Sequence, residues 1–208
     1  MIRYYLWDFD GTLFDTYPVM ATAFREALHD FGHEAAYVDI YAKMKVSMDV
    51  VIDFYLKEFR LENSFVERYL TILSDKINEI RAFPDVEETL AAIVKNGGKN
   101  FIVTHRGRST NDVIEHLHLS QYFVEFVTSE NGFARKPSPD AINYLLEKYS
   151  LKPEETIMVG DRALDILAGK NAGCMTAYFR GDAYVEDVET DIDVASFKDF
   201  MSIMGLLV

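Results

Sequence analysis

Short apolar runs recur along this chain, and each is too brief to form an ordinary helix. They are Tyr4–Trp7, Asn100–Val103, Val124–Thr128, Thr156–Gly160 and a run that begins at Cys174. The intervals between them carry apolar residues at helical spacing. Short buried strands that alternate with helices are typical of a parallel sheet with right-handed crossovers, covered by helices on both faces. The sequence therefore predicts an α/β fold.

One long interval departs from this alternation. Between Tyr17 and Arg81 no segment has the pattern of a buried strand, and the helical periodicity predicts about four helices. We therefore expect a Rossmann-like core built from residues 1–16 and 82–208, with residues 17–81 as a helical insertion. A chain of 208 residues is long enough for one such core with a small inserted domain.

Two aspartates follow the first apolar run directly, in the stretch Asp8-Phe9-Asp10-Gly11-Thr12. In open α/β sheets, ligands bind at the carboxyl ends of the strands. Asp8 and Asp10 are two residues apart on an extended backbone, so they project to the same side, where two carboxylates repel unless a cation or a shared proton separates them. The pattern indicates a metal site, although Asp-Gly-Thr is also an ordinary turn sequence and Asp8 could be a helix cap.

Polar residues also follow two later strands. Thr104 and His105 come after one of them, and Asp161 comes after another, with Asp165 four residues further along. Because parallel strands end at the same edge of a sheet, these side chains are candidates for the site of Asp8.

A lysine precedes one of the predicted helices. We expect Ser138 to be the N-cap of that helix and Pro139 its first residue. A cation ahead of a helix N-terminus is electrostatically unfavourable unless an anion lies between them. Lys136 is therefore a candidate anion ligand.

Charge and hydropathy exclude several classes of partner. The formal net charge is -13, and both nucleic acid and anionic membranes are bound chiefly through Lys and Arg. No apolar run approaches the roughly 18 residues of a membrane span, and the N-terminus lacks a basic-then-apolar signal pattern. We expect a cytoplasmic protein with no nucleic-acid or membrane partner.

Taken together, the polar stretches resemble the motifs of the haloacid dehalogenase (HAD) superfamily, in the same order along the chain. The matching stretches are Asp8-x-Asp10-Gly11-Thr12, Thr104 at a strand end, Lys136 before a helix, and Gly160-Asp161-x-x-x-Asp165. The insertion lies between the first and second motifs, which resembles the helical cap of the class that includes phosphoglycolate phosphatase and β-phosphoglucomutase. The resemblance implies a HAD-like hydrolase of the phosphatase type with a helical cap.

The resemblance also implies a role for each carboxylate. Asp8 would be the nucleophile that forms an aspartyl phosphate, and Asp10 would be the general acid and base. Mg²⁺ would be held by Asp8, Asp161 and the backbone carbonyl of Asp10, with Asp165 orienting these ligands. The metal would cancel charge between an anionic nucleophile and an anionic substrate.

Phosphate binding is assigned by the same resemblance. Lys136 and the Thr104 hydroxyl, with backbone N–H groups near Gly11 and His105, would bind the phosphoryl oxygens. His105 and Arg106 differ from the small or amide residues common after this threonine in the family. Their roles stay open: either could touch substrate, or Arg106 could point to solvent.

The leading hypothesis is a Mg²⁺-dependent phosphatase of a small phosphorylated metabolite, acting as a monomer or homodimer. A β-phosphoglucomutase-like phosphosugar mutase is the first alternative, because it would use the same residues and transfer the phosphoryl group to a sugar hydroxyl. The alternative from another class is a catalytically silent protein that binds a phosphometabolite. Such a protein would be expected to lack one of the key residues, and all are present. No motif identifies the substrate.

Overall fold

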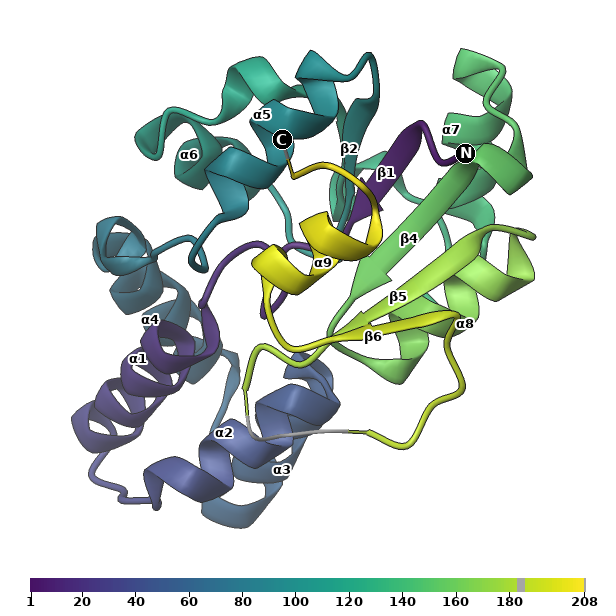
Figure 1. Ribbon diagram of the computed structural model, residues 1–208. Coiled ribbons are helices and arrows are strands. Elements are labelled where there is room, and N and C mark those ends of the chain that lie inside the picture. Colours follow the sequence, from purple (N-terminus) through teal and green to yellow (C-terminus); the bar gives the residue numbers. More distant parts are fainter. Residues whose placement is uncertain (183–185, 208) are drawn as a thin grey trace. The chain divides into compact units, whose positions relative to one another are not determined.

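The computed structural model describes residues 1–182 and 186–207 (Figure 1). Within these residues the chain forms a six-stranded sheet in the order β3-β2-β1-β4-β5-β6, and every neighbouring pair is parallel. The strands are β1 (Tyr4–Trp7), β2 (Lys99–Val103), β3 (Phe123–Val127), β4 (Thr156–Gly160), β5 (Met175–Phe179) and β6 (Ile192–Val194). The predicted parallel α/β sheet is confirmed, and β1 lies at its centre.

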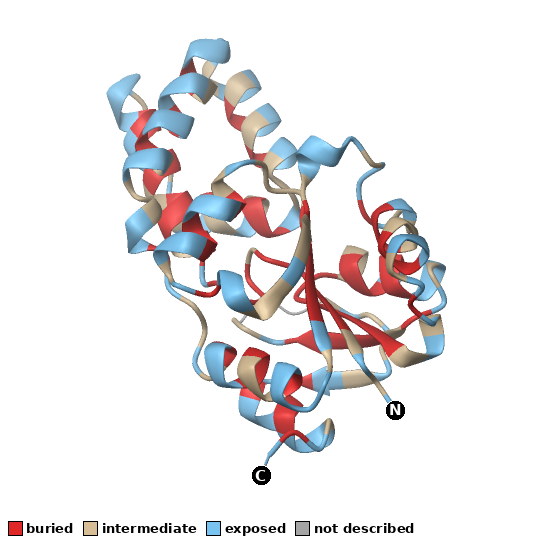
Figure 2. Ribbon diagram, turned by 90° about the horizontal axis from the view of Figure 1, so that it is seen from above, coloured by how far each residue is buried: buried red, intermediate tan, exposed pale blue. Residues whose placement is uncertain are grey.

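Helices cover both faces of the sheet, because successive strand residues point to opposite sides. On one face, α7 (Asp140–Tyr149) and α8 (Ala163–Asn171) pack in the cluster that contains Leu6. On the other, Trp7 contacts rings of α9 (Phe197–Ile203), which packs against α5 (Val86–Lys95). Figure 2 shows buried residues along the central strands. The remaining helical segments of this part are α6 (Ser109–His116), η2 (Ser120–Tyr122), η3 (Ser129–Asn131) and η4 (Pro153–Glu155).

Residues 16–81 form a separate compact unit, distinct from the unit made of residues 1–15 and 82–208. Its helices are α1 (Tyr17–Asp30), α2 (Tyr37–Val46), α3 (Met48–Phe59), α4 (Asn63–Asp75) and the short η1 (Ile77–Glu79). The core of this unit is aromatic: the Phe24 ring lies 5.0 Å from Phe65 and 5.2 Å from Tyr69. The predicted helical insertion after the first strand is confirmed.

The predicted start of α7 is wrong by one residue. The helix begins at Asp140, and Pro139 precedes it with φ -81° and ψ 0°, a turn conformation rather than a helical one. Ser138 Oγ still accepts a hydrogen bond from the Asp140 N–H at 3.3 Å, so the polar side chain acts at the helix end as expected. In the part of the chain that the structure describes, no helix is both long and apolar enough to span a membrane.

A buried polar contact joins β1 to β2. Trp7 Nε1 donates to Asn100 Oδ1 at 3.0 Å, and Asn100 Nδ2 lies 3.3 Å from the Leu90 carbonyl and 3.1 Å from the Tyr122 carbonyl. Both Trp7 and Asn100 are fully buried. A buried amide that satisfies three partners ties the central strand to its neighbour and to the segments beside it.

We expect Asn100→Ala to destabilise the protein by about 3 kcal/mol, because a buried donor, a buried carbonyl and a partly buried carbonyl lose their partner and a cavity forms. The free energy of unfolding, measured with urea, tests this. The control is Asn96→Ala, an exposed asparagine whose side chain bonds the Ala92 carbonyl, for which we expect a loss of about 0.5 kcal/mol or less. Equal losses for the two variants would contradict the prediction.

Candidate active site

The site lies at the carboxyl edge of the sheet, where β1, β2 and β4 end side by side. Asp8 follows β1, Thr104 follows β2 and Asp161 follows β4. Asp165 lies in the first turn of α8, and Lys136 lies in the loop before α7. Parallel pairing therefore brings together residues that are far apart in the sequence.

Three carboxylates form the centre of this site. Asp8, Asp161 and Asp165 are all buried, and each offers an oxygen within 4.8 Å of the others. Among the described residues, Asp8 Oδ2 is buried and has no hydrogen-bond partner. Carboxylate oxygens are the ligands that Mg²⁺ prefers, and a buried unpaired oxygen is costly without a cation. The cluster can therefore hold a metal ion.

Glycine and threonine residues shape this cluster. A Cβ on Gly160 would lie 2.2 Å from Asp165 Cβ, so only glycine lets α8 bring Asp165 so near the end of β4. Gly11 has φ +82°, the left-handed conformation that glycine tolerates best in the turn after Asp10. Thr12 Oγ1 donates to Asp161 Oδ1 at 3.4 Å and so links the first motif to the last.

Lys136 lies within the cluster. Its Nζ is 2.5 Å from Asp8 Oδ1, 2.5 Å from Asp165 Oδ1 and 3.0 Å from the Val103 carbonyl oxygen. Burial disfavours the charged ammonium, but Asp165 and Asp8 outweigh this effect and hold the pKa of Lys136 above its ordinary value. Lys136 is therefore a buried cation that is shared by two carboxylates.

The carboxylates respond to this shared cation differently. Burial opposes the ionisation of Asp8, yet Lys136 and Arg162 hold the pKa of Asp8 below its usual value. Burial and the Asp8 charge raise the pKa of Asp165 despite its contact with Lys136. One ammonium does not neutralise both groups, and a further cation would relieve their repulsion. The electrostatics of the site thus fit a divalent metal.

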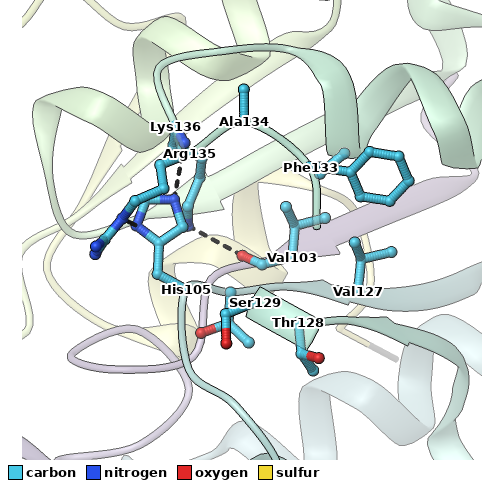
Figure 3. A pocket seen from close by; sticks show the side chains of 11 residues that line it. Val103, His105, Val127, Thr128, Ser129, Phe133, Ala134, Arg135 and Lys136 are labelled. Carbon is cyan, nitrogen blue, oxygen red and sulfur yellow. Dashed lines mark hydrogen bonds between the residues drawn. The ribbon is translucent and has the colours of Figure 1, made fainter. Parts of the chain in front are cut away.

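His105 supports the main chain at Lys136. Its Nε2 accepts a hydrogen bond from the Lys136 N–H at 2.8 Å, and Nδ1 lies 3.3 Å from Arg135 Nε (Figure 3). A neutral imidazole has one acceptor nitrogen, so we take the shorter contact as the hydrogen bond and place the proton on Nδ1. Burial, with the charges of Lys136 and Arg135, lowers the pKa of His105 to about 3. These residues line a cavity of about 240 Å³ that Thr104 also borders.

We expect His105 to make the protein less stable in acid. Its pKa falls from 6.5 in the unfolded chain to about 3 in the fold, so between these values the unfolded chain binds the proton and stability is lost as the pH falls. In His105→Gln the amide oxygen can accept the same N–H without titrating. Urea unfolding at about pH 7.5 and about pH 5 should show a smaller acid loss for His105→Gln than for the wild type. His116→Gln, at an exposed histidine, should match the wild type, and the same acid loss in all three proteins would contradict the prediction.

Asp10 and Thr104 complete the set of predicted site residues. The Asp10 side chain is not among the three clustered carboxylates: its Oδ1 lies 2.9 Å from Arg106 Nη1. The open alternative that Arg106 points to solvent is wrong, because its side chain is only 7% exposed. Thr104 Oγ1 accepts the Arg106 backbone N–H at 3.1 Å, which leaves the single hydroxyl proton of Thr104 available for donation.

Sequence reasoning missed one further cation at the site. Arg162 is buried, its Nε lies 4.0 Å from Asp161 Oδ1, and its charge lowers the pKa of Asp8. The only signal in the sequence is its place directly after Asp161, at the end of β4. A strand-end position beside a candidate ligand is reason to consider a charged residue as part of the site.

The fold and the site together define a class of protein. It is an α/β protein that has a helical insertion after the first strand. A buried carboxylate cluster and a lysine lie at the carboxyl edge of its parallel sheet. Residues 5–179 match the family described as haloacid dehalogenase-like hydrolase, and the chain belongs to this family. It is therefore a hydrolase, and the family resemblance of its motifs is confirmed.

Individual relatives agree with this assignment. The chain is 32% identical to a phosphoglycolate phosphatase of Vibrio vulnificus, in a match that covers 83% of this chain and 81% of that protein. It is 30% identical to the pyrophosphatase PpaX of Bacillus mycoides, in a match that covers 96% of this chain and 95% of that protein. The crystal structure of a predicted phosphoglycolate phosphatase from Haemophilus somnus has a TM-score of 0.84 at 23% identity, covers 98% of both chains and shows the same fold.

Proposed function

We propose that this protein is a Mg²⁺-dependent phosphatase that hydrolyses a small phosphorylated metabolite through an aspartyl phosphate on Asp8. The observation that carries the proposal is the environment of Asp8. One carboxylate oxygen contacts the Lys136 ammonium, and the other is buried without a hydrogen-bond partner in the described part of the chain. The relatives support the proposal, since their names, a phosphatase and a pyrophosphatase, both denote hydrolysis of phosphoryl bonds.

The reaction would take place in two steps. An Asp8 oxygen attacks phosphorus, the bond to the leaving oxygen breaks, and Asp10 gives its proton to that oxygen. Water then attacks the aspartyl phosphate, Asp10 takes the proton of that water, and inorganic phosphate leaves with the Asp8 carboxylate restored. Asp8 suits the first role because Lys136 and Arg162 keep it ionised in spite of its burial.

Oriented donors would bind the phosphoryl group. The Lys136 ammonium and the Thr104 hydroxyl would contact its oxygens, together with backbone N–H groups near Gly11 and His105. The imidazole of His105 holds the main chain at Lys136, and the backbone N–H of Arg106 orients the Thr104 hydroxyl. The donors are therefore held in place before substrate arrives, which is the condition under which they stabilise developing charge most.

The residues that would hold Mg²⁺ are Asp8, Asp161 and the backbone carbonyl of Asp10, with Asp165 orienting them. Bound Mg²⁺ supplies the positive charge that lets the Asp8 carboxylate approach an anionic phosphate. In the same proposal residues 1–16 and 82–208 are the catalytic core, and residues 17–81 are the cap.

We expect phosphate release to fall at least about tenfold when EDTA removes the metal, and to return when Mg²⁺ is added in excess. The test is a panel of phosphorylated metabolites, including phosphoglycolate and inorganic pyrophosphate, assayed for phosphate release and for isomer formation. Release of phosphate from a monoester supports the proposal, whereas isomer formation would favour the mutase alternative. Full turnover in EDTA would contradict the metal assignment, and no turnover of any compound would contradict the proposed phosphatase activity.

A further inference from the structure

A second ion pair lies beside the cluster around Lys136. Arg106 Nη1 contacts Asp10 Oδ1 at 2.9 Å, with side-chain exposures of 7% for Arg106 and 18% for Asp10. Arg106 lies in the loop between β2 and α6, and Asp10 lies in the turn after β1. The pair therefore connects two loops at the carboxyl edge of the sheet.

Several contacts hold Arg106 in this position. Its Nε donates to Ser109 Oγ at 2.8 Å, and its guanidinium carbon lies 5.3 Å from the centre of the Phe9 ring. Its backbone N–H donates to Thr104 Oγ1 at 3.1 Å, and its carbonyl accepts the Ser129 N–H at 3.0 Å. A planar guanidinium that is hydrogen-bonded at Nε and lies near an aromatic ring presents its remaining donors in a fixed direction.

The neighbouring Arg108 lacks this support. Its side chain is 88% exposed and pairs with Glu130, whose side chain is 49% exposed. An ion pair of this kind contributes little to stability or geometry. The contrast indicates that the loop places Arg106, and not Arg108, for a specific contact.

The Asp10 carboxylate needs such a contact if it is to be kept apart from the cluster. Lys136 is already shared by Asp8 and Asp165. A free Asp10 side chain, two residues from Asp8, would be attracted to the same ammonium and to any cation held by the three carboxylates. The Arg106 guanidinium gives Asp10 a separate cation as its partner. Of the two aspartates Asp8 and Asp10, therefore, only Asp8 contacts Lys136.

We propose that Arg106 is a positioning residue, which holds the Asp10 carboxylate away from the cluster and aimed for proton exchange with the leaving group. The inference rests on the proposed function. In the described part of the chain the contact uses Oδ1, which leaves Oδ2 as the oxygen that gives the proton to the leaving alcohol and later takes one from water. Arg106 itself stays charged throughout and exchanges no proton.

A double-mutant cycle with two substrates tests this. Arg106→Met, Asp10→Asn and the double variant are assayed with the alkyl phosphate of highest turnover in the panel and with 4-nitrophenyl phosphate, whose leaving oxygen needs little protonation. We expect Arg106→Met to lower kcat for the alkyl phosphate by about 10- to 100-fold with KM nearly unchanged, and by about threefold or less for the aryl phosphate. In the Asp10→Asn background, Arg106→Met should change kcat by about twofold or less.

Two further variants control for structural effects. Arg108→Met should retain wild-type kinetics, and Arg106→Lys should recover part of the alkyl phosphate rate because it keeps a cation near Asp10. A loop distorted by loss of Arg106 would instead lower the rate for both substrates, and would do so equally with and without Asp10.

The inference is overturned if Arg106→Met slows the reaction of both substrates equally, or if its effect on kcat is multiplicative with that of Asp10→Asn. It is also overturned if Arg106→Met raises KM at constant kcat, because that result would indicate contact between Arg106 and the substrate. These outcomes differ from failure of the proposed function itself. In that case the wild-type protein would release no phosphate, or would do so equally well in EDTA.

Discussion

Asp8→Asn is expected to lower turnover by at least about 10⁴-fold and to leave no phosphoenzyme, because an amide is a poor nucleophile and forms no stable acyl phosphate. The variant should fold, since Lys136 keeps Asp165 as a charged partner and Asn has nearly the shape of Asp. Rapid-quench trapping with a labelled phosphate monoester measures the covalent intermediate directly, and thermal unfolding checks the fold.

Asp10→Asn is the matched control, because it makes the same chemical change two residues away. Its side chain lies outside the clustered carboxylates, so the proposed nucleophile and all of the proposed metal ligands, including the backbone carbonyl at position 10, remain. We expect labelled enzyme to form from an aryl phosphate, and to form slowly from an alkyl phosphate, which needs an acid for its leaving oxygen. Labelling of Asp8→Asn at the wild-type level, or an Asp10→Asn defect equal for both substrates, would contradict the proposed roles.

Lys136→Met is expected to lower kcat by about 10²- to 10³-fold, as for loss of one oriented donor to developing charge. The reason begins in the resting enzyme. Without the ammonium, Asp8 and Asp165 face each other in a buried site, and their repulsion raises the pKa of one of them. A protonated Asp8 would be a weak nucleophile, so the loss extends beyond phosphate binding.

Steady-state kinetics and unfolding measurements on the same preparation test this prediction. Removing one member of a buried ion cluster also destabilises the fold, so rates are compared only at temperatures where the variant is folded. Lys148→Met is the control: Lys148 also pairs with a carboxylate, Glu125, but its side chain is 44% exposed. Wild-type kcat in folded Lys136→Met, or an equal loss in Lys148→Met, would contradict a catalytic role for Lys136.

Local sequence alone determined the strands that carry the site. The run Tyr4–Trp7 has the length and composition of a buried strand, and Asp8 follows it directly. The same adjacency holds for Val103 with Thr104 and for Gly160 with Asp161. Strand ends in a parallel sheet share one edge, so knowledge of the strands was enough to predict that Asp8, Thr104 and Asp161 lie at the same edge. The helical insertion is predictable for the same reason, because its periodicity is local.

Other elements depend on partners that a local pattern does not reveal. The strand β6 has only the residues Ile192–Val194, too few for a recognisable alternation, and it exists by pairing with β5. Burial of α9 depends on rings of Phe197 and Phe200 that pack against Trp7, a residue almost the whole chain away. Tertiary contacts, and not propensity, decide such short elements.

Side-chain partners within the site were decided by tertiary structure. Sequence places His105 and Arg106 at the end of a strand but leaves their roles open. In the fold the His105 ring binds the main chain at Lys136, and Arg106 pairs with Asp10, 96 positions away. Periodicity and propensity determine the path of the backbone, whereas the partner of a long charged side chain depends on which loops the sheet edge brings within a few ångströms of it.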